Sequence, residues 1–146
     1  MNPQSDRYEI LFTFENIAIK GFNQQETRNW IIDTINKEGH APGIIQFIFC
    51  DDNQLLKINQ DYLNHNTLTD IVTFNYNDEF EGISGDIFIS VDRVRENAED
   101  YNVTFIEELH RVIIHGILHL LGFDDQDDRT REAIRAKENY YLSLLV

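Results

Sequence analysis

The segment TFIEELHRVIIHGILHLLG, residues 104–122, constrains the fold most, because it reads as a helix that is apolar on almost every side. Such a helix is normally buried, so the rest of the chain has to cover it. Thr104 followed by Glu107 is the capping-box pattern, and Gly122 is typical of a helix end. We therefore expect one long buried helix over these residues. Three histidines lie inside it, two of them four residues apart (His115 and His119), and a buried imidazole has to be paired, protonated or bound to a ligand.

The segments that precede this helix predict a sheet. Strand-like runs rich in β-branched and aromatic residues cover residues 8–19, 44–50, 70–76 and 85–91. Helical patterns cover residues 25–39, 51–63 and 92–102, and a final helix starts between Asp128 and Thr130. The short polar loop between the last two strands favours an antiparallel pair. The predicted fold class is α+β, with helices packed on a four-stranded sheet.

Length and composition predict one cytoplasmic domain. The 146 residues suit a single domain over 1–146. No apolar run is long enough to span a membrane, and the polar N-terminus MNPQSDRYEI does not resemble a signal peptide. Cys50 is the single cysteine, so no intrachain disulfide can form, and we expect it to be a small buried hydrophobic residue.

The net charge of −14 disfavours a nonspecific nucleic-acid binder, whose affinity depends on cationic side chains near phosphates. The stretch RTREAIRAK, residues 129–137, is a local exception, with four basic residues and one acid. A solvated helix face is the favoured interpretation of this stretch. A local basic patch for a polyanion is the alternative.

The sequence HGILHLLGFDD, residues 115–125, predicts a metal site. His115 and His119 are four residues apart on a helix, so both rings can reach one ion. Gly122 can adopt the left-handed conformation that ends a helix, and the chain can then bring Asp125 back toward the rings. Three protein ligands leave a coordination position open, which is typical of a catalytic zinc. We predict one zinc ion per chain.

The same spacing matches the metzincin peptidase signature HExxHxxGxxH, with two changes. Gly116 stands where those enzymes carry the general-base glutamate, and Asp125 replaces the last histidine. The missing carboxylate argues against a peptidase, although the helix remains metzincin-like. Two histidines and one carboxylate are also the ligand set of iron(II) oxygenases, so that class stays open.

Three blocks of the chain together resemble the YbeY-type endoribonucleases and ribosomal RNA maturation factors. HGILHLLGFDD resembles the family pattern HGxLHLxGYDH, INQDYLNHNTLTDIVTFNY resembles LNxxYRxxxxPTDVLSFP, and SGDIFISVDRV resembles LGDIxIS. The resemblance implies an α+β fold with zinc on His115, His119 and Asp125. It also implies a single-strand-specific endoribonuclease that acts in small-subunit ribosomal RNA maturation and ribosome quality control, with contact to the subunit directly or through a ribosomal protein.

The chain departs from the family pattern at two positions. Asp125 replaces the third histidine, which still permits zinc binding but adds a negative charge. Leu63 stands where the family has an arginine suited to clamping phosphate, so a non-catalytic, zinc-stabilised assembly factor is the main alternative to a nuclease. Asp70 and Asp86 match family positions. Each is a candidate general base or partner of a ligand histidine, or else a turn residue bound to local backbone.

Overall fold

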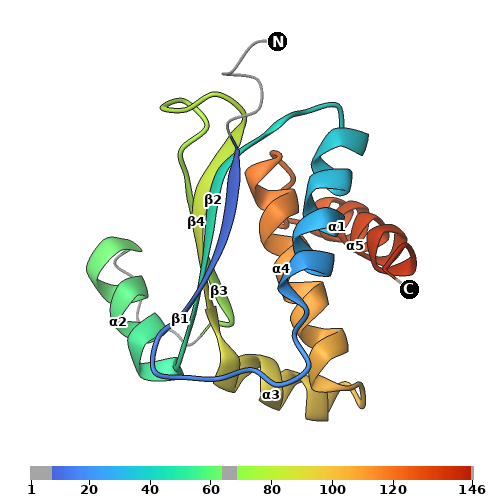
Figure 1. Cartoon of the computed structure of the whole chain (residues 1–146). Coiled ribbons are helices and arrows are strands. Elements are labelled where there is room, and N and C mark those ends of the chain that lie inside the picture. Colours follow the sequence, from blue (N-terminus) through green and yellow to red (C-terminus); the bar gives the residue numbers. More distant parts are fainter. Residues whose placement is uncertain (1–7, 64–68, 146) are drawn as a thin grey trace.

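The structure is a computed structural model that describes residues 8–63 and 69–145, and these residues form an α+β fold (Figure 1). The strands are Glu9–Phe14 (β1), Pro42–Cys50 (β2), Ile71–Asn75 (β3) and Ile83–Ser90 (β4). The helices are Gln24–Lys37 (α1), Asp52–Leu63 (α2), Val91–Asp100 (α3), Phe105–Leu120 (α4) and Asp128–Ser143 (α5). The predicted fold class is confirmed.

The four strands form one mixed sheet in the order β1, β2, β4, β3. Strand β2 runs parallel to both β1 and β4, whereas β3 pairs antiparallel with β4, as the short connecting loop predicts. The central position of β2 explains its apolar sequence. Phe47 and Ile48 are neighbours that point to opposite faces of the sheet, and both are buried.

The two faces of the sheet are covered unequally, with α1, α4 and α5 on one side and α2 on the other (Figure 1). The main core lies on the three-helix side, where Phe47 and Ile87 of the sheet and Ile113 and Ile117 of α4 are fully buried in one cluster. Helix α4 contacts β3 and β4 as well as α1, α3 and α5. The apolar character of α4 thus matches its central position.

Polar contacts tie the far end of α5 to α1. Trp30 of α1 is 5% exposed, and its indole Nε1 donates a hydrogen bond of 2.8 Å to the carbonyl oxygen of Tyr141. The Lys137 ammonium lies 3.0 Å from Oε2 of Glu38, and the Tyr141 hydroxyl also donates to that oxygen. Helix α5 is therefore held against α1 by both buried and partly exposed groups.

The first strand is shorter than its sequence predicts. The strand expected over residues 8–19 ends at Phe14, and Asn16 then takes a left-handed backbone conformation with a φ of 57°. Ile17 and Ile19 pack against the core from an irregular segment. Apolar residues can be half-buried without joining a sheet, which explains why the pattern overestimates the strand.

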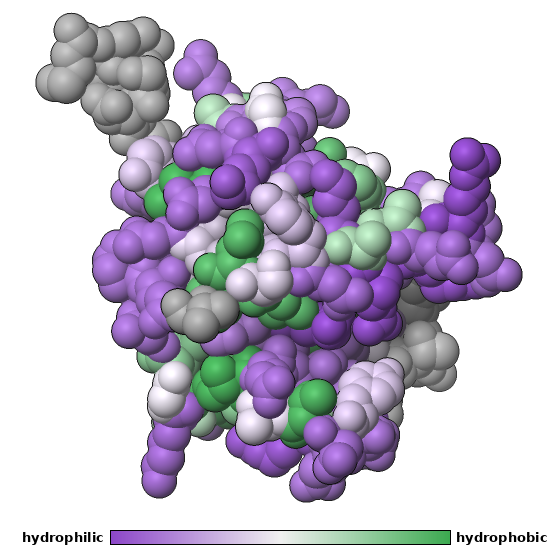
Figure 2. Space-filling view, turned by 90° about the vertical axis from the view of Figure 1, so that its right-hand side faces the viewer, coloured by the Kyte–Doolittle hydropathy of each residue, from purple (hydrophilic) through white to green (hydrophobic). Residues whose placement is uncertain are grey.

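The side of the molecule shown in Figure 2 is mainly hydrophilic, and its hydrophobic side chains form small separate patches. Among the described residues, no helix combines the length and the apolar character needed to cross a membrane.

Candidate metal centre

Both ends of α4 are set by local side-chain and backbone contacts. Thr104 and Glu107 form the predicted capping box, in which each side chain accepts a hydrogen bond of 3.1 Å from the other residue's backbone N–H. At the other end Gly122 has a φ of +103°, and the backbone N–H of Phe123 donates to the carbonyl of Leu118 at 3.0 Å. This is a Schellman ending, which reverses the chain after the helix as predicted.

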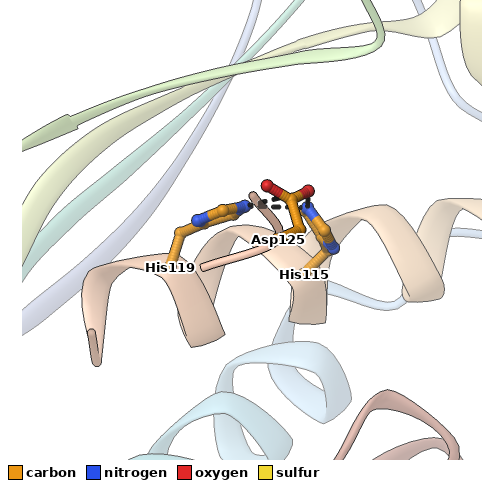
Figure 3. Close-up of side chains that lie close together, drawn as sticks. All are labelled: His115, His119 and Asp125. Carbon is orange, nitrogen blue, oxygen red and sulfur yellow. Dashed lines mark hydrogen bonds and ion pairs between the residues drawn. The ribbon is translucent and has the colours of Figure 1, made fainter. Parts of the chain in front are cut away.

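The reversed chain brings Asp125 back to the two histidines of α4. In Figure 3 both imidazoles project from α4, and the Asp125 carboxylate of the following segment lies next to them. The two histidine Nε2 atoms are 2.9 Å apart, and Asp125 Oδ2 lies 3.6 Å from Nε2 of His115 and 3.8 Å from Nε2 of His119. The three residues predicted as ligands are therefore brought together, and they could hold a metal ion.

The spacing of these atoms suits a small cation with tetrahedral coordination. Ligand bonds of about 2.0 to 2.1 Å to zinc place two tetrahedral ligand atoms about 3.3 Å apart. The distances of 2.9, 3.6 and 3.8 Å lie on both sides of that value. The side chains of His115 and His119 are 22% and 25% exposed, and that of Asp125 is 44% exposed. The cluster is thus open to solvent on one side.

A buried carboxylate supports His115 from α5. Glu138 Oε2 lies 2.5 Å from Nδ1 of His115, while Oε1 accepts a hydrogen bond of 2.9 Å from Arg111. The Glu138 side chain is only 4% exposed. When Nδ1–H donates to this carboxylate, Nε2 faces the ligand cluster, which is the arrangement of a metal-bound histidine oriented by an acid. Glu138 is not among the site residues expected from the sequence.

The charges around the cluster have opposite effects on the two histidines. Burial favours the neutral form of His115, but the hydrogen bond and charge of Glu138 outweigh it and raise the pKa of this histidine. Burial and the neighbouring His115 lower the pKa of His119. Burial also opposes ionisation of Glu138, but its contacts with His115 and Arg111 lower its pKa, so the supporting carboxylate is ionised. A cation bound at the two Nε2 atoms would therefore contact the neutral ring of His119 and the ring of His115, which is hydrogen-bonded to the ionised Glu138 carboxylate.

Asp70 lies in the same pocket as the cluster, just before β3. The pocket has a volume of about 570 Å³, and its wall includes Asp70, His115 and Asp125. Burial raises the pKa of Asp70, and the carboxylate accepts a hydrogen bond of 3.5 Å from Asn97 of α3. This candidate for proton transfer or for orienting a ligand is thus within the pocket.

Asp86 and Leu63 are placed elsewhere. Asp86 is next to Gly85 and Ile87, which face α4, so its side chain lies on the opposite face of the sheet, where the Tyr76 hydroxyl donates to it at 3.2 Å. Leu63 is the last residue of α2, the helix that covers that opposite face, and it is 39% exposed. The pocket wall around His115 contains neither residue.

Gly116 allows α4 to approach the sheet closely. A Cβ atom at this position would lie 2.9 Å from Cδ1 of Ile71 and 3.1 Å from Cγ2 of Ile87. A glutamate there would have to enter this packed interface between helix and sheet. The peptidase interpretation therefore lacks its general base, as the sequence indicates, and the structure leaves no room to supply one.

The fold and the site together define a class, an α+β protein with a candidate metal centre on a central helix. The family model described as "Endoribonuclease YbeY" matches residues 10–146, so the chain belongs to the YbeY family. The resemblance seen in the three sequence blocks is therefore confirmed.

Curated relatives and a solved structure agree with this assignment. A protein named "Endoribonuclease YbeY" from Flavobacterium psychrophilum is 53% identical over 116 residues, which cover 80% of this chain and 82% of the relative. One of the same name from Flavobacterium johnsoniae is 50% identical over 137 residues, covering 94% and 93% of the two chains. The solution structure of TM1509 from Thermotoga maritima matches with a TM-score of 0.65 at 26% identity, covering 94% of this chain and 89% of the other.

Proposed function

We propose that this chain is a zinc-dependent endoribonuclease that cuts single-stranded RNA during maturation and quality control of the small ribosomal subunit. The observation that carries the proposal is the convergence of His115, His119 and Asp125 in one cluster, with ligand atoms 2.9 to 3.8 Å apart. His115 and Asp125 of this cluster also line the pocket. Relatives at 53% and 50% identity are named endoribonucleases, which supports RNA as the substrate class. Ribosomal RNA, and docking to the subunit directly or through a ribosomal protein, follow from the family resemblance.

In this proposal His115, His119 and Asp125 hold one zinc ion, and Glu138 orients His115 through Nδ1. Zinc, when bound, supplies a Lewis acid that activates water or polarises a phosphodiester oxygen. The partial exposure of the three side chains leaves the cluster accessible to a polymer substrate. Glu138 and Arg111, which are hydrogen-bonded to each other, keep the ligand ring in place during this chemistry.

Asp70 is the better of the two candidates for a general base or acid. It lines the pocket, and burial raises the pKa of its carboxyl group, which favours proton uptake. Asp86 lies across the sheet, so a direct role in proton transfer at the cluster is less well supported. In our proposal Asp70 accepts or donates the proton that moves during cleavage.

The test measures zinc content and cleavage of a single-stranded ribosomal RNA fragment on the same samples, purified without oxygen so that iron can be detected. Wild type should carry one zinc per chain and cut the fragment, and His115→Ala and Asp125→Ala should lose zinc and about 100-fold or more of the activity. Asp124→Ala removes a neighbouring exposed acid and should keep both properties.

Other results would point to another class. A folded, zinc-loaded wild type that leaves RNA intact, with a melting temperature that falls on chelation, would indicate the non-catalytic assembly factor. Cleavage that is equal in wild type and His115→Ala would show that the metal cluster is not the catalytic site. Stoichiometric iron in place of zinc would contradict the zinc assignment and would reopen the oxygenase class.

A further inference from the structure

Three arginines lie in the wall of the pocket that His115 and Asp125 of the ligand cluster also line. Arg111 comes from α4, and Arg131 and Arg135 come from α5. The chain as a whole has a net charge of −14, so cations placed here are not a sample of a generally basic surface. Their position next to His115 and Asp125 makes them candidates for contact with an anionic substrate.

The three guanidinium groups differ in their hydrogen bonds to neighbouring residues and in their exposure to solvent. Arg111 donates to Glu138 at 2.9 Å and to Asn139 at 3.0 Å, so it holds the carboxylate that supports His115. Arg131 donates to the carbonyl oxygen of Asp125 at 3.2 Å and also pairs with Asp128, yet its side chain is 55% exposed.

Arg135 is the most available of the three. Its side chain is 63% exposed, and its Nε lies 3.8 Å from Oε1 of Glu138, a carboxylate oxygen that already accepts from Arg111. Arg131 and Arg135 are four residues apart on α5, so their side chains share one face of that helix.

Acidic groups also face this pocket and limit how strongly it attracts anions. The acids of the wall are Asp70, Glu108, Asp125, Asp128, Glu132 and Glu138. Glu138 is neutralised by Arg111 and His115, and Asp125 belongs to the candidate ligand cluster. Asp128 is 95% exposed and can leave Arg131 for solvent at little cost.

We propose that Arg135, with Arg131 beside it, binds a backbone phosphate of the RNA strand and so positions the strand across the metal centre. A guanidinium group pairs a phosphate through two parallel hydrogen bonds, which fixes orientation as well as position. The inference rests on the proposed function for its substrate. Arg131 and Arg135 would allow this acidic protein to bind a polyanion at the pocket.

The test measures binding of a fluorescein-labelled single-stranded oligoribonucleotide to zinc-loaded full-length protein by fluorescence anisotropy, over a range of salt concentrations. Arg135→Gln should weaken binding about tenfold, and the Arg131→Gln/Arg135→Gln double variant should weaken it further. The slope of log affinity against log salt should fall by about 0.7 for each phosphate contact removed. Arg135→Lys keeps the charge without the paired hydrogen bonds and should fall between wild type and Arg135→Gln.

Arg129→Gln is the matched control, because it removes the same charge from an exposed position of α5 that the pocket wall does not include. It should bind RNA as wild type does. Zinc content is measured for every variant, since Arg131 also contacts the Asp125 backbone.

Equal RNA binding by Arg135→Gln and Arg129→Gln would overturn the inference, whether or not the wild type cleaves RNA. Wild type that fails to bind the oligoribonucleotide at low salt would also overturn it. Wild type that binds through these arginines but does not cleave would leave the inference standing and would contradict the proposed nuclease activity.

Discussion

Glu138 illustrates how a single side chain can depend on long-range structure. The two histidines and Asp125 were predictable as a set, because a helix and one glycine turn place them within a short stretch of chain. Glu138 reaches His115 only because α5 packs against α4, and no local pattern specifies that pairing. A signal was nevertheless present. Glu138 follows Ile134 by one helical turn on the buried face of α5, and an acid there is expected to have a partner.

Replacing Glu138 by glutamine should weaken zinc binding while the fold is retained. The amide has nearly the same volume but lacks the negative charge that holds Nδ1–H of His115, so zinc affinity should fall about 10-fold to 100-fold. Competition with a chromophoric chelator measures this change. Glu132→Gln, which removes another acid of the same pocket wall, should leave affinity unchanged. Equal affinity in both variants would mean that Glu138 does not support the site.

At the scale of elements, the glycines that end the helices determine where the chain goes after each helix. Gly122 and Gly39 end α4 and α1 in the same way, with φ values of +103° and +83°. In each case the residue after the glycine donates its backbone N–H to a carbonyl oxygen of the helix. Phe123 donates to Leu118 after Gly122, and His40 donates to Ile35 after Gly39. Space for a methyl group is open at both glycines, so the backbone conformation alone distinguishes glycine from alanine there.

Alanine at either glycine should lower the free energy of unfolding by about 1 to 2 kcal/mol, because the left-handed conformation is unfavourable for a residue with a Cβ atom. Only Gly122→Ala should also weaken zinc binding, since only that turn positions Asp125. Urea unfolding and zinc titration of the two variants measure both effects. If Gly39→Ala weakened zinc binding as much as Gly122→Ala, the turn would have no specific role in building the site.

Sequence patterns located the elements well but not every boundary. The capping box at Thr104 and the glycine at position 122 predicted α4 almost to the residue, because caps are local hydrogen-bonding requirements. Residues 15–19 fall within the first predicted strand, because the run over residues 8–19 is rich in β-branched and aromatic residues. The apolar character of this segment is explained by packing of Ile17 and Ile19 against the core, which needs no strand.

At the scale of the whole molecule, the order of the strands could not be predicted from local pattern. Strand β4 lies between β2 and β3, so β2 pairs with a strand that is distant in sequence, across an intervening helix and strand. Such pairings depend on how buried faces match in three dimensions. The antiparallel β3 and β4 pair was the exception, because a short loop limits the possible geometries.

The contact between α1 and α5 predicts a pH dependence of stability. Burial opposes ionisation of Glu38, but hydrogen bonds from Tyr141 and Lys137 outweigh burial and lower its pKa below the ordinary value of 4.5. A lowered pKa in the folded state stabilises the fold above pH 4.5, and this contribution is lost as the pH falls through the folded-state pKa.

Wild type should therefore be more stable than Glu38→Gln by about 1 kcal/mol near neutral pH, and the difference should shrink in acid. Urea unfolding of both proteins across this pH range measures the difference. Glu99→Gln, which removes one negative charge from an exposed position of α3, is the matched control for the change in net charge. A gap that stays constant down to acid pH would indicate that the Glu38 charge is not the cause.

The indole of Trp30 gives this protein a built-in optical probe. It is the single tryptophan of the chain, and its N–H is bonded to the backbone of Tyr141 in α5. Detachment of α5 would expose the ring to water and shift its emission to longer wavelength. Stopped-flow fluorescence could then time the departure of the helix that carries Glu138, without any added dye.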